Sequence, residues 1–233
     1  MALQTRPEAP ARRFYMAALE PPGNIAREIA LFRRRLFAAS GDPSALAFPE
    51  LVPLAIGRIS SKRPIRLRRR DLEHLFDSAW EGVTGSFRLG QSLSAEGKLY
   101  LRTEGPVEKL AAAARRLMDE AGFEPDPSPP LRCAEGFFLC RSQPAVEPIA
   151  AGVQVAVADA ATSPSGSGSD DGLSAAARQT PPGSSFGDAQ LVFLRFDSGP
   201  DPFAALAWKE LGRSRRLRGK PERAGREEPT PGT

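Results

Sequence analysis

The sequence predicts an α+β protein with two lobes, each a duplicated β-α-β unit with antiparallel strands, arranged around a central groove. Two observations predict this class. A strand, a helix and a second strand occur in that order over residues 14–59, and the same order returns over residues 98–141, aligned without a gap at an offset of 85 residues. Two further strands, expected at 153–158 and 190–196, would add to the second lobe. Repeats of this length are typical of two-lobed folds, whose ligands bind in the groove between the lobes.

The first unit starts with an apolar strand at 14–19, which ends at the breaker Pro21-Pro22-Gly23. Asn24 is the expected N-cap of the helix that follows. The apolar residues of this helix recur at spacings of four, three and four, which places them on one face: Ile25, Ile29, Phe32 and Leu36. A turn at 40–43 ends the helix, and a strand is expected at 51–59.

The connection to the second unit contains three expected elements: a basic strand at 64–69, a short helix or turn at 71–76 and a strand at 86–89. The second unit then repeats the order of the first, with a strand at 98–103, the breaker Gly105-Pro106, a helix at 107–121 with Gly122 as its C-cap, a Pro-rich loop at 125–130 and a strand at 136–141. The equivalent positions include Tyr15 with Tyr100, Pro21 with Pro106, Ile25 with Leu110, Val52 with Phe137 and Leu54 with Leu139.

Composition predicts one folded domain with disordered additions. The chain of 233 residues contains 21 glycines and 23 prolines, concentrated in a few polar stretches that lack the apolar groups needed to offset ordering entropy. We therefore expect disorder at 1–11, a single bilobal domain at 12–212 with a disordered insertion at 159–185, and a disordered basic tail at 213–233. A short helix is expected immediately before this tail.

The two cysteines, Cys133 and Cys140, have no partner at metal-ligand spacing and are expected to be small core residues, so no metal and no cofactor are predicted. Trp80 and Trp208 are expected to be anchors of the core or of the lobe interface. The sequence contains no apolar run long enough to span a membrane and no apolar signal region near residue 1, which predicts no membrane partner and a cytoplasmic location.

Three segments together resemble the 2H phosphoesterase superfamily, the 2′-5′ RNA ligase-like proteins, over about residues 12–212. They are the opening strand and breaker RFYMAALEPPGNI, the equivalent strands LVPLAIG and GFFLCRS, and the ending QLVFLRF followed by FAALAWKELG. The resemblance implies a two-lobed fold in which each lobe supplies a His-x-Thr/Ser motif from one central strand. In that family, one imidazole acts as general base and the other as general acid on a phosphodiester.

Both motifs are degenerate in this chain. Through the strand register, the first motif falls on Leu51 and Pro53 and the second on Gly136 and Phe138, so both histidines and both hydroxyls are missing. His74 is the single histidine and occupies neither motif position. The resemblance therefore implies the fold without the reaction, and no catalytic residue is assigned.

Arginines are the remaining candidates for a phosphate contact, because a guanidinium can hold phosphate oxygens bidentately. Arg58 and Arg141 lie near the ends of the two motif strands. Arg66 and Arg68 lie in the basic run that follows the first of these strands, on the solvent face of an expected strand. Such a stripe could follow an RNA backbone, but a charged edge strand that resists aggregation would have the same pattern.

Three functions remain open on the sequence alone. The first is an inactive 2H phosphoesterase-like protein that binds RNA or a nucleotide phosphate. The second is a protein-interaction module whose apolar groove, lined by Leu51, Pro53 and Phe138, receives a peptide. The third is an RNA 2′,3′-cyclic phosphodiesterase with an unrecognised site.

Overall fold

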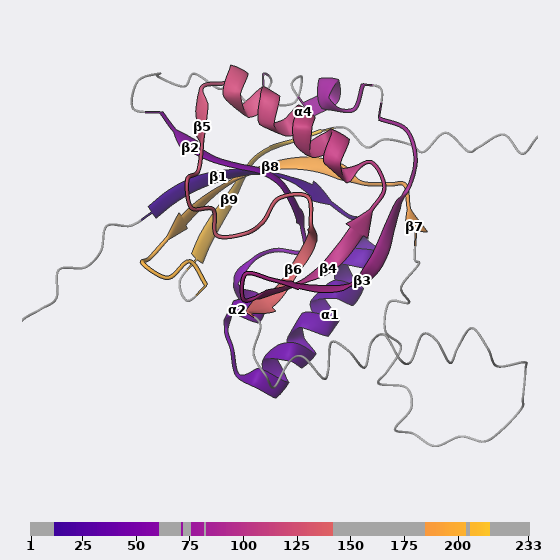
Figure 1. Cartoon of the computed structure of the whole chain (residues 1–233), viewed down its shortest axis with the longest axis vertical. Helices are drawn as coiled ribbons and strands as arrows, with labels where there is room; N and C mark the ends of the chain where they lie inside the picture. Colours follow the sequence, from indigo (N-terminus) through magenta and orange to yellow (C-terminus); the bar gives the residue numbers. More distant parts are fainter. Residues whose placement is uncertain are drawn as a thin grey trace, which may run out of the picture.

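A computed structural model describes residues 12–60, 71, 76–81, 83–141, 185–203 and 206–214. The fold is α+β, with two antiparallel sheets and two long helices (Figure 1). The strands expected at 64–69 and 153–158 lie outside the described residues. The same is true of His74, of the segments 1–11 and 159–184, and of the tail after residue 214. No helix in the described ranges has both the length and the apolar character needed to cross a membrane.

The first sheet has five strands in the order β5-β2-β1-β8-β9. Their bounds are Phe123–Pro125 for β5, Val52–Ile59 for β2, Arg12–Glu20 for β1, Gln190–Ser198 for β8 and Leu206–Arg213 for β9. The central strand β1 pairs antiparallel with β2 on one side and β8 on the other. The N-terminal and C-terminal parts of the chain therefore share one sheet.

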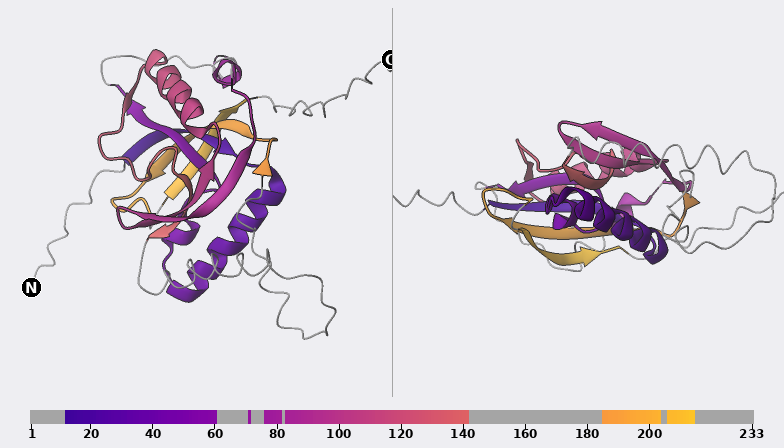
Figure 2. Two further views of the ribbon diagram at one scale, coloured as in Figure 1. Left: turned by 45° about the vertical axis from the view of Figure 1, so that its right-hand side comes forward. Right: turned by 90° about the horizontal axis from the view of Figure 1, so that it is seen from below.

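The second sheet has four strands in the order β6-β4-β3-β7. Their bounds are Gly136–Arg141 for β6, Lys98–Glu104 for β4, Phe87–Ala95 for β3 and Ser185–Phe186 for β7. In the right-hand view of Figure 2, the two sheets are seen as separate layers.

The expected strand-helix-strand order is present in both halves, as β1-α1-β2 and as β4-α4-β6. The helices are α1 (Gly23–Ser40) and α4 (Val107–Glu120), and a short α2 (Ser44–Ala47) follows α1. In each unit the two strands pair antiparallel. α4 packs on β2 and α1 contacts β6, so each helix contacts the second strand of the other unit.

Two hydrophobic clusters fill the interior. The larger one joins both sheets to α1 and α4, and includes Ile29, Leu54, Leu110 and Leu139. The smaller one lies on the opposite face of β1 and contains six aromatic rings, from Phe14, Phe48, Tyr100, Phe138, Phe196 and Phe203. We call these six rings the aromatic cluster. It joins the two sheets, because β1 and β8 contribute Phe14 and Phe196 while β4 and β6 contribute Tyr100 and Phe138.

Trp80 is an anchor between the sheets, as expected, whereas Trp208 is not. The Trp80 indole is buried, packs edge-on against Phe87 of β3 and donates a hydrogen bond of 3.2 Å from Nε1 to Oγ of Ser214, which directly follows β9. Trp208 lies on the edge strand β9 and is 51% exposed. Its indole is therefore available at the surface.

Several local expectations were wrong. The segment expected to form a short helix before the tail is the strand β9, which extends through Arg213, because pairing with β8 outweighs the weak helix preference of its Ala and Leu residues. Asn24 is not the N-cap, since α1 begins at Gly23 with Pro22 in the cap position. The expected loop 125–130 follows a short strand, β5, which the sequence pattern did not indicate.

Candidate functional site

The two strands that correspond to the motif positions lie beside each other, although they belong to different sheets. β2 and β6 are in contact. The backbone N–H of Ala134, two residues before β6, donates a hydrogen bond of 2.8 Å to the carbonyl of Pro53 in β2. The structure thus brings together the two segments that the sequence pattern paired.

The four degenerate motif positions are buried. Leu51 and Phe138 are 7% and 3% exposed, and Pro53 and Gly136 are also buried. The Phe138 ring lies 5.6 Å from Phe48, 5.9 Å from Tyr100 and 5.4 Å from Phe203, measured between ring centroids. Apolar rings therefore occupy the space between the motif strands.

This arrangement changes the expectation of an open apolar groove. Leu51 and Phe138 belong to the interior, packed against rings that arrive from four other segments of the chain. A peptide could reach Phe138 only by displacing the aromatic cluster. Phe138→Asp would place a carboxylate in the core and unfold the protein. This substitution is therefore unsuitable as a test of peptide binding.

Three titratable groups near the motif strands, Tyr100, Cys133 and Cys140, have raised pKa values. Burial raises the pKa of Tyr100 to about 12, and its hydroxyl accepts a hydrogen bond of 3.0 Å from the Arg132 backbone N–H. Burial also raises the pKa of the Cys133 thiol to about 11 and that of Cys140 to about 12. At neutral pH, the phenol and both thiols are protonated, and a thiol is a poor nucleophile compared with a thiolate.

Arg141 is engaged within the protein. Its guanidinium forms an ion pair with Asp201 and lies 4.7 Å from the ring centroid of Phe203. Its backbone N–H donates a hydrogen bond of 2.9 Å to Oγ of Ser44 in α2. These contacts hold the end of β6 against α2 and the loop before β9. The Arg141 charge is therefore paired with Asp201 within the protein.

Arg58 lies on the other sheet, near the end of β2, and is exposed. The structure does not bring it together with Arg141, whose neighbours are Ser44, Asp201 and Phe203. Arg66 and Arg68, the other two candidates, lie outside the described residues.

A hollow lies at one end of the first sheet, on the face that carries the aromatic cluster. The hollow has a volume of about 380 Å³ and lies where β1 passes into α1, next to β9. Leu51, at the first motif position, forms part of its wall. Its polar lining comes from three acidic residues and two others: Glu20, Glu50, Asp188, Gln190 and Arg213.

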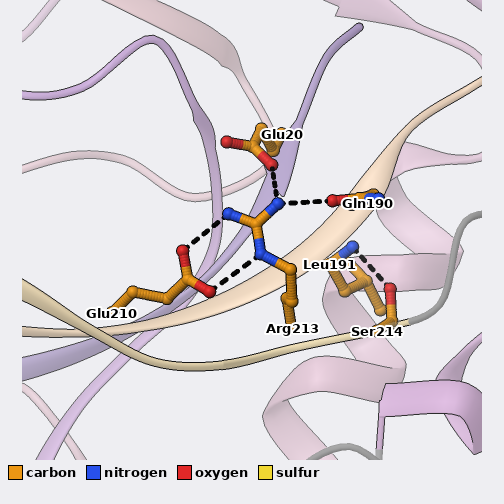
Figure 3. A network of polar contacts seen from close by, with 6 residues as sticks. All are labelled: Glu20, Gln190, Leu191, Glu210, Arg213 and Ser214. Atoms are coloured by element: carbon orange, nitrogen blue, oxygen red, sulfur yellow. Dashed lines mark hydrogen bonds and ion pairs between the residues drawn. The ribbon is translucent and has the colours of Figure 1, made fainter.

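Arg213 connects three strands beside this hollow (Figure 3). Its Nη1 donates hydrogen bonds to Glu20 of β1 at 3.0 Å and to Gln190 of β8 at 2.6 Å. Its Nε and Nη2 donate to the two carboxylate oxygens of Glu210 at 2.8 and 2.6 Å. The hydrogen bonds to Glu210, followed by the charges of Glu20 and Glu210, raise the pKa of Arg213.

Sequence reasoning missed this hollow. The sequence pattern places Arg213 in the tail and Trp208 in the interior, and Glu20 and Asp188 lie far from each other in the chain. The available signal was the spacing of Trp208 and Glu210 in LAWKELGR, since residues two positions apart lie on the same face of a strand. In the described part of the chain, no group of three or more His, Cys, Asp or Glu side chains is placed to hold a metal ion.

A second hollow, of about 330 Å³, lies between β2, α4 and β5. Its lining is mainly apolar, with Ile56, Met118 and Phe123 at its wall and Arg115 and Arg116 among its charged residues.

No protein-family model matches the chain, and no curated protein matches it.

Proposed function

We propose that the chain is a catalytically inactive 2H phosphoesterase-like protein that binds RNA or a nucleotide phosphate. The observation that carries the loss of activity is the burial of both motif segments under the aromatic cluster. A two-histidine mechanism needs two imidazoles that face a solvent-accessible phosphodiester. Here Leu51 and Gly136 take the positions of the two histidines, and both residues are buried.

The order of elements supports the likeness to the 2H fold. β1-α1-β2 and β4-α4-β6 have the same order, and the second strand of each unit lies against that of the other. This order is compatible with a 2H-like frame from which the motifs are missing. Phosphate binding is assigned to the basic residues that follow β2, because the space between β2 and β6 is filled.

We expect no turnover of 2′,3′-cyclic nucleotides by the full chain. Incubation of the purified protein with 2′,3′-cyclic AMP, followed by chromatography of the nucleotides, should give the same product level as buffer alone. A matched His74→Ala preparation serves as the control for contaminating activity. Turnover by the parent protein that disappears in His74→Ala would contradict the inactive assignment.

Exposed Arg58 lies at the end of β2, directly before the basic run, which favours a phosphate contact on this side of the molecule. Arg66→Ala combined with Arg68→Ala should weaken binding of a short single-stranded RNA at low salt. It should also reduce the slope of log affinity against log salt by about 1.4, because two phosphates of the single strand would no longer be neutralised by the protein. Fluorescence anisotropy of a labelled RNA, repeated at several salt concentrations, measures both quantities.

The matched control is Arg27→Ala combined with Arg34→Ala, which removes the same charge from the exposed face of α1. An equal loss of affinity in both double variants would show that only net charge matters. That result, or the absence of any RNA binding at low salt, would remove the support for the RNA proposal.

A further inference from the structure

The acidic hollow at the end of β1 has an electrostatic character opposite to that of a phosphate site. Three carboxylates, from Glu20, Glu50 and Asp188, line it together with one guanidinium, from Arg213. An anion placed there would be repelled by the carboxylates, whereas a cation would be attracted by them. The negative charge of the lining therefore favours a cationic ligand.

The charge of Arg213 is already matched within the protein. Glu210 holds the guanidinium through both of its carboxylate oxygens, and Glu20 bonds the remaining terminal nitrogen. A guanidinium held in this way has few donor hydrogens left for a ligand anion. Glu50 is likewise paired with the buried Arg33 at 3.1 Å.

The start of α1 also borders the hollow, through Gly23 and Ala26. A helix N-terminus carries a positive end equivalent to about half an elementary charge. This partial charge favours anions, but it is smaller than the excess of negative charge, because the carboxylates of Glu20, Glu50, Asp188 and Glu210 face only the guanidiniums of Arg213 and Arg33. The net field in the hollow is therefore negative.

Trp208 adds an aromatic surface to the acidic lining. Its indole is 51% exposed and forms part of the wall of the hollow. In the pairing of β8 with β9, Trp208 lies opposite Phe196, a member of the aromatic cluster, which places both side chains on the same face of the sheet. An aromatic ring beside carboxylates is a favourable environment for an organic cation, because the ring face attracts positive charge.

The size of the hollow fits an extended side chain. A volume of about 380 Å³ is within the range of sites for small organic ligands, roughly 300–1,000 Å³, and is much larger than a single metal ion needs. An arginine side chain supplies a planar cation that can bond a carboxylate and stack on an indole at the same time.

From these contacts we infer that the acidic hollow binds an arginine side chain of a partner peptide. The guanidinium lies against Trp208 and bonds the carboxylates of Asp188 and Glu20. This inference goes beyond the RNA contact proposed for the basic run, since the hollow recognises the opposite charge.

The test is calorimetric titration of the full chain with tetra-arginine that is acetylated at its N-terminus and amidated at its C-terminus. We expect saturable binding that weakens as salt is added, because the carboxylates are near the surface. Asp188→Asn and Trp208→Ala should each lower the affinity about fivefold. Asp119→Asn, which makes the same change on the exposed end of α4, should leave the affinity unchanged.

Absence of saturable binding, or an equal effect of Asp188→Asn and Asp119→Asn, would overturn the site. Binding of inorganic tripolyphosphate that is lost in Trp208→Ala would also overturn it, because the hollow would then select anions. The RNA titration is measured separately, with the Arg66 and Arg68 variants. Failure at the hollow is thus distinguishable from failure of the phosphate proposal.

Discussion

Replacing Gly136 with alanine should destabilise the protein by about 3–5 kcal/mol. Gly136 has φ +152°, and a Cβ at this position would lie 2.0 Å from the carbonyl oxygen of Leu101, 2.7 Å from its carbonyl carbon and 2.8 Å from Cα of Arg102. All three atoms belong to the backbone of β4, which pairs with β6 at this point. Because a backbone cannot rotate away as a side chain does, the two strands would have to separate locally.

Urea unfolding monitored by circular dichroism measures this loss, with the m-value as a check that the unfolding reaction is unchanged. Gly23→Ala is the matched control, because a Cβ at Gly23 meets no atom within 4 Å. It should change the free energy of unfolding by less than about 1 kcal/mol. A Gly136→Ala protein as stable as the parent would show that β4 and β6 do not approach as described.

The same contact limits attempts to rebuild a motif. The second motif of the 2H family would need a histidine at Gly136, and any side chain there meets the β4 backbone before its imidazole is considered. A single substitution to histidine at Gly136 therefore could not be accommodated without a local separation of β4 and β6.

Phe138→Ala should cost about 3–5 kcal/mol, the usual range for loss of a buried aromatic side chain. Phe138 is 3% exposed and contacts the rings of Phe48, Tyr100 and Phe203. Its removal would leave a cavity between the two sheets, where the aromatic cluster is the main apolar contact on that face. The free energy of unfolding in urea is again the measurement.

Phe37→Ala is the matched control for this prediction, since Phe37 lies on α1 and is 38% exposed. Its loss should cost less than about 1 kcal/mol. If both variants lost the same stability, the cluster would not be a structural element, and the space between β2 and β6 would again be available to a ligand.

The sequence predicted the elements whose pattern is local. The apolar spacing from Ile25 to Leu36 predicted α1, and the alternating and apolar runs predicted the strands that became β1, β2, β4, β6 and β8. It did not predict β9, because the helix-forming residues of that segment are held as a strand by pairing with β8. Long-range pairing is invisible in a local window, which is also why β5 was missed.

The site was predictable to the same limited extent. The assignment of Leu51, Pro53, Gly136 and Phe138 as degenerate motif positions came from the family resemblance and the strand register, and it stays a prediction. Their burial required knowledge of how Phe14, Phe48, Phe196 and Phe203 converge from separate segments. The acidic hollow was hidden for a similar reason, since Glu20, Asp188 and Arg213 meet only when β1, β8 and β9 form one sheet.

The position of β1 has a consequence for the order of folding during synthesis. β1 leaves the ribosome long before β8, one of its two neighbours in the sheet, because the paired residues Arg12 and Ser198 are 186 positions apart in the sequence. The loop that this pairing closes is long, so its entropic cost delays completion of the five-stranded sheet until β8 has been made. During that interval one edge of a strand whose six central residues, Phe14–Leu19, are apolar is unpaired, and an unpaired apolar edge promotes aggregation of the incomplete chain.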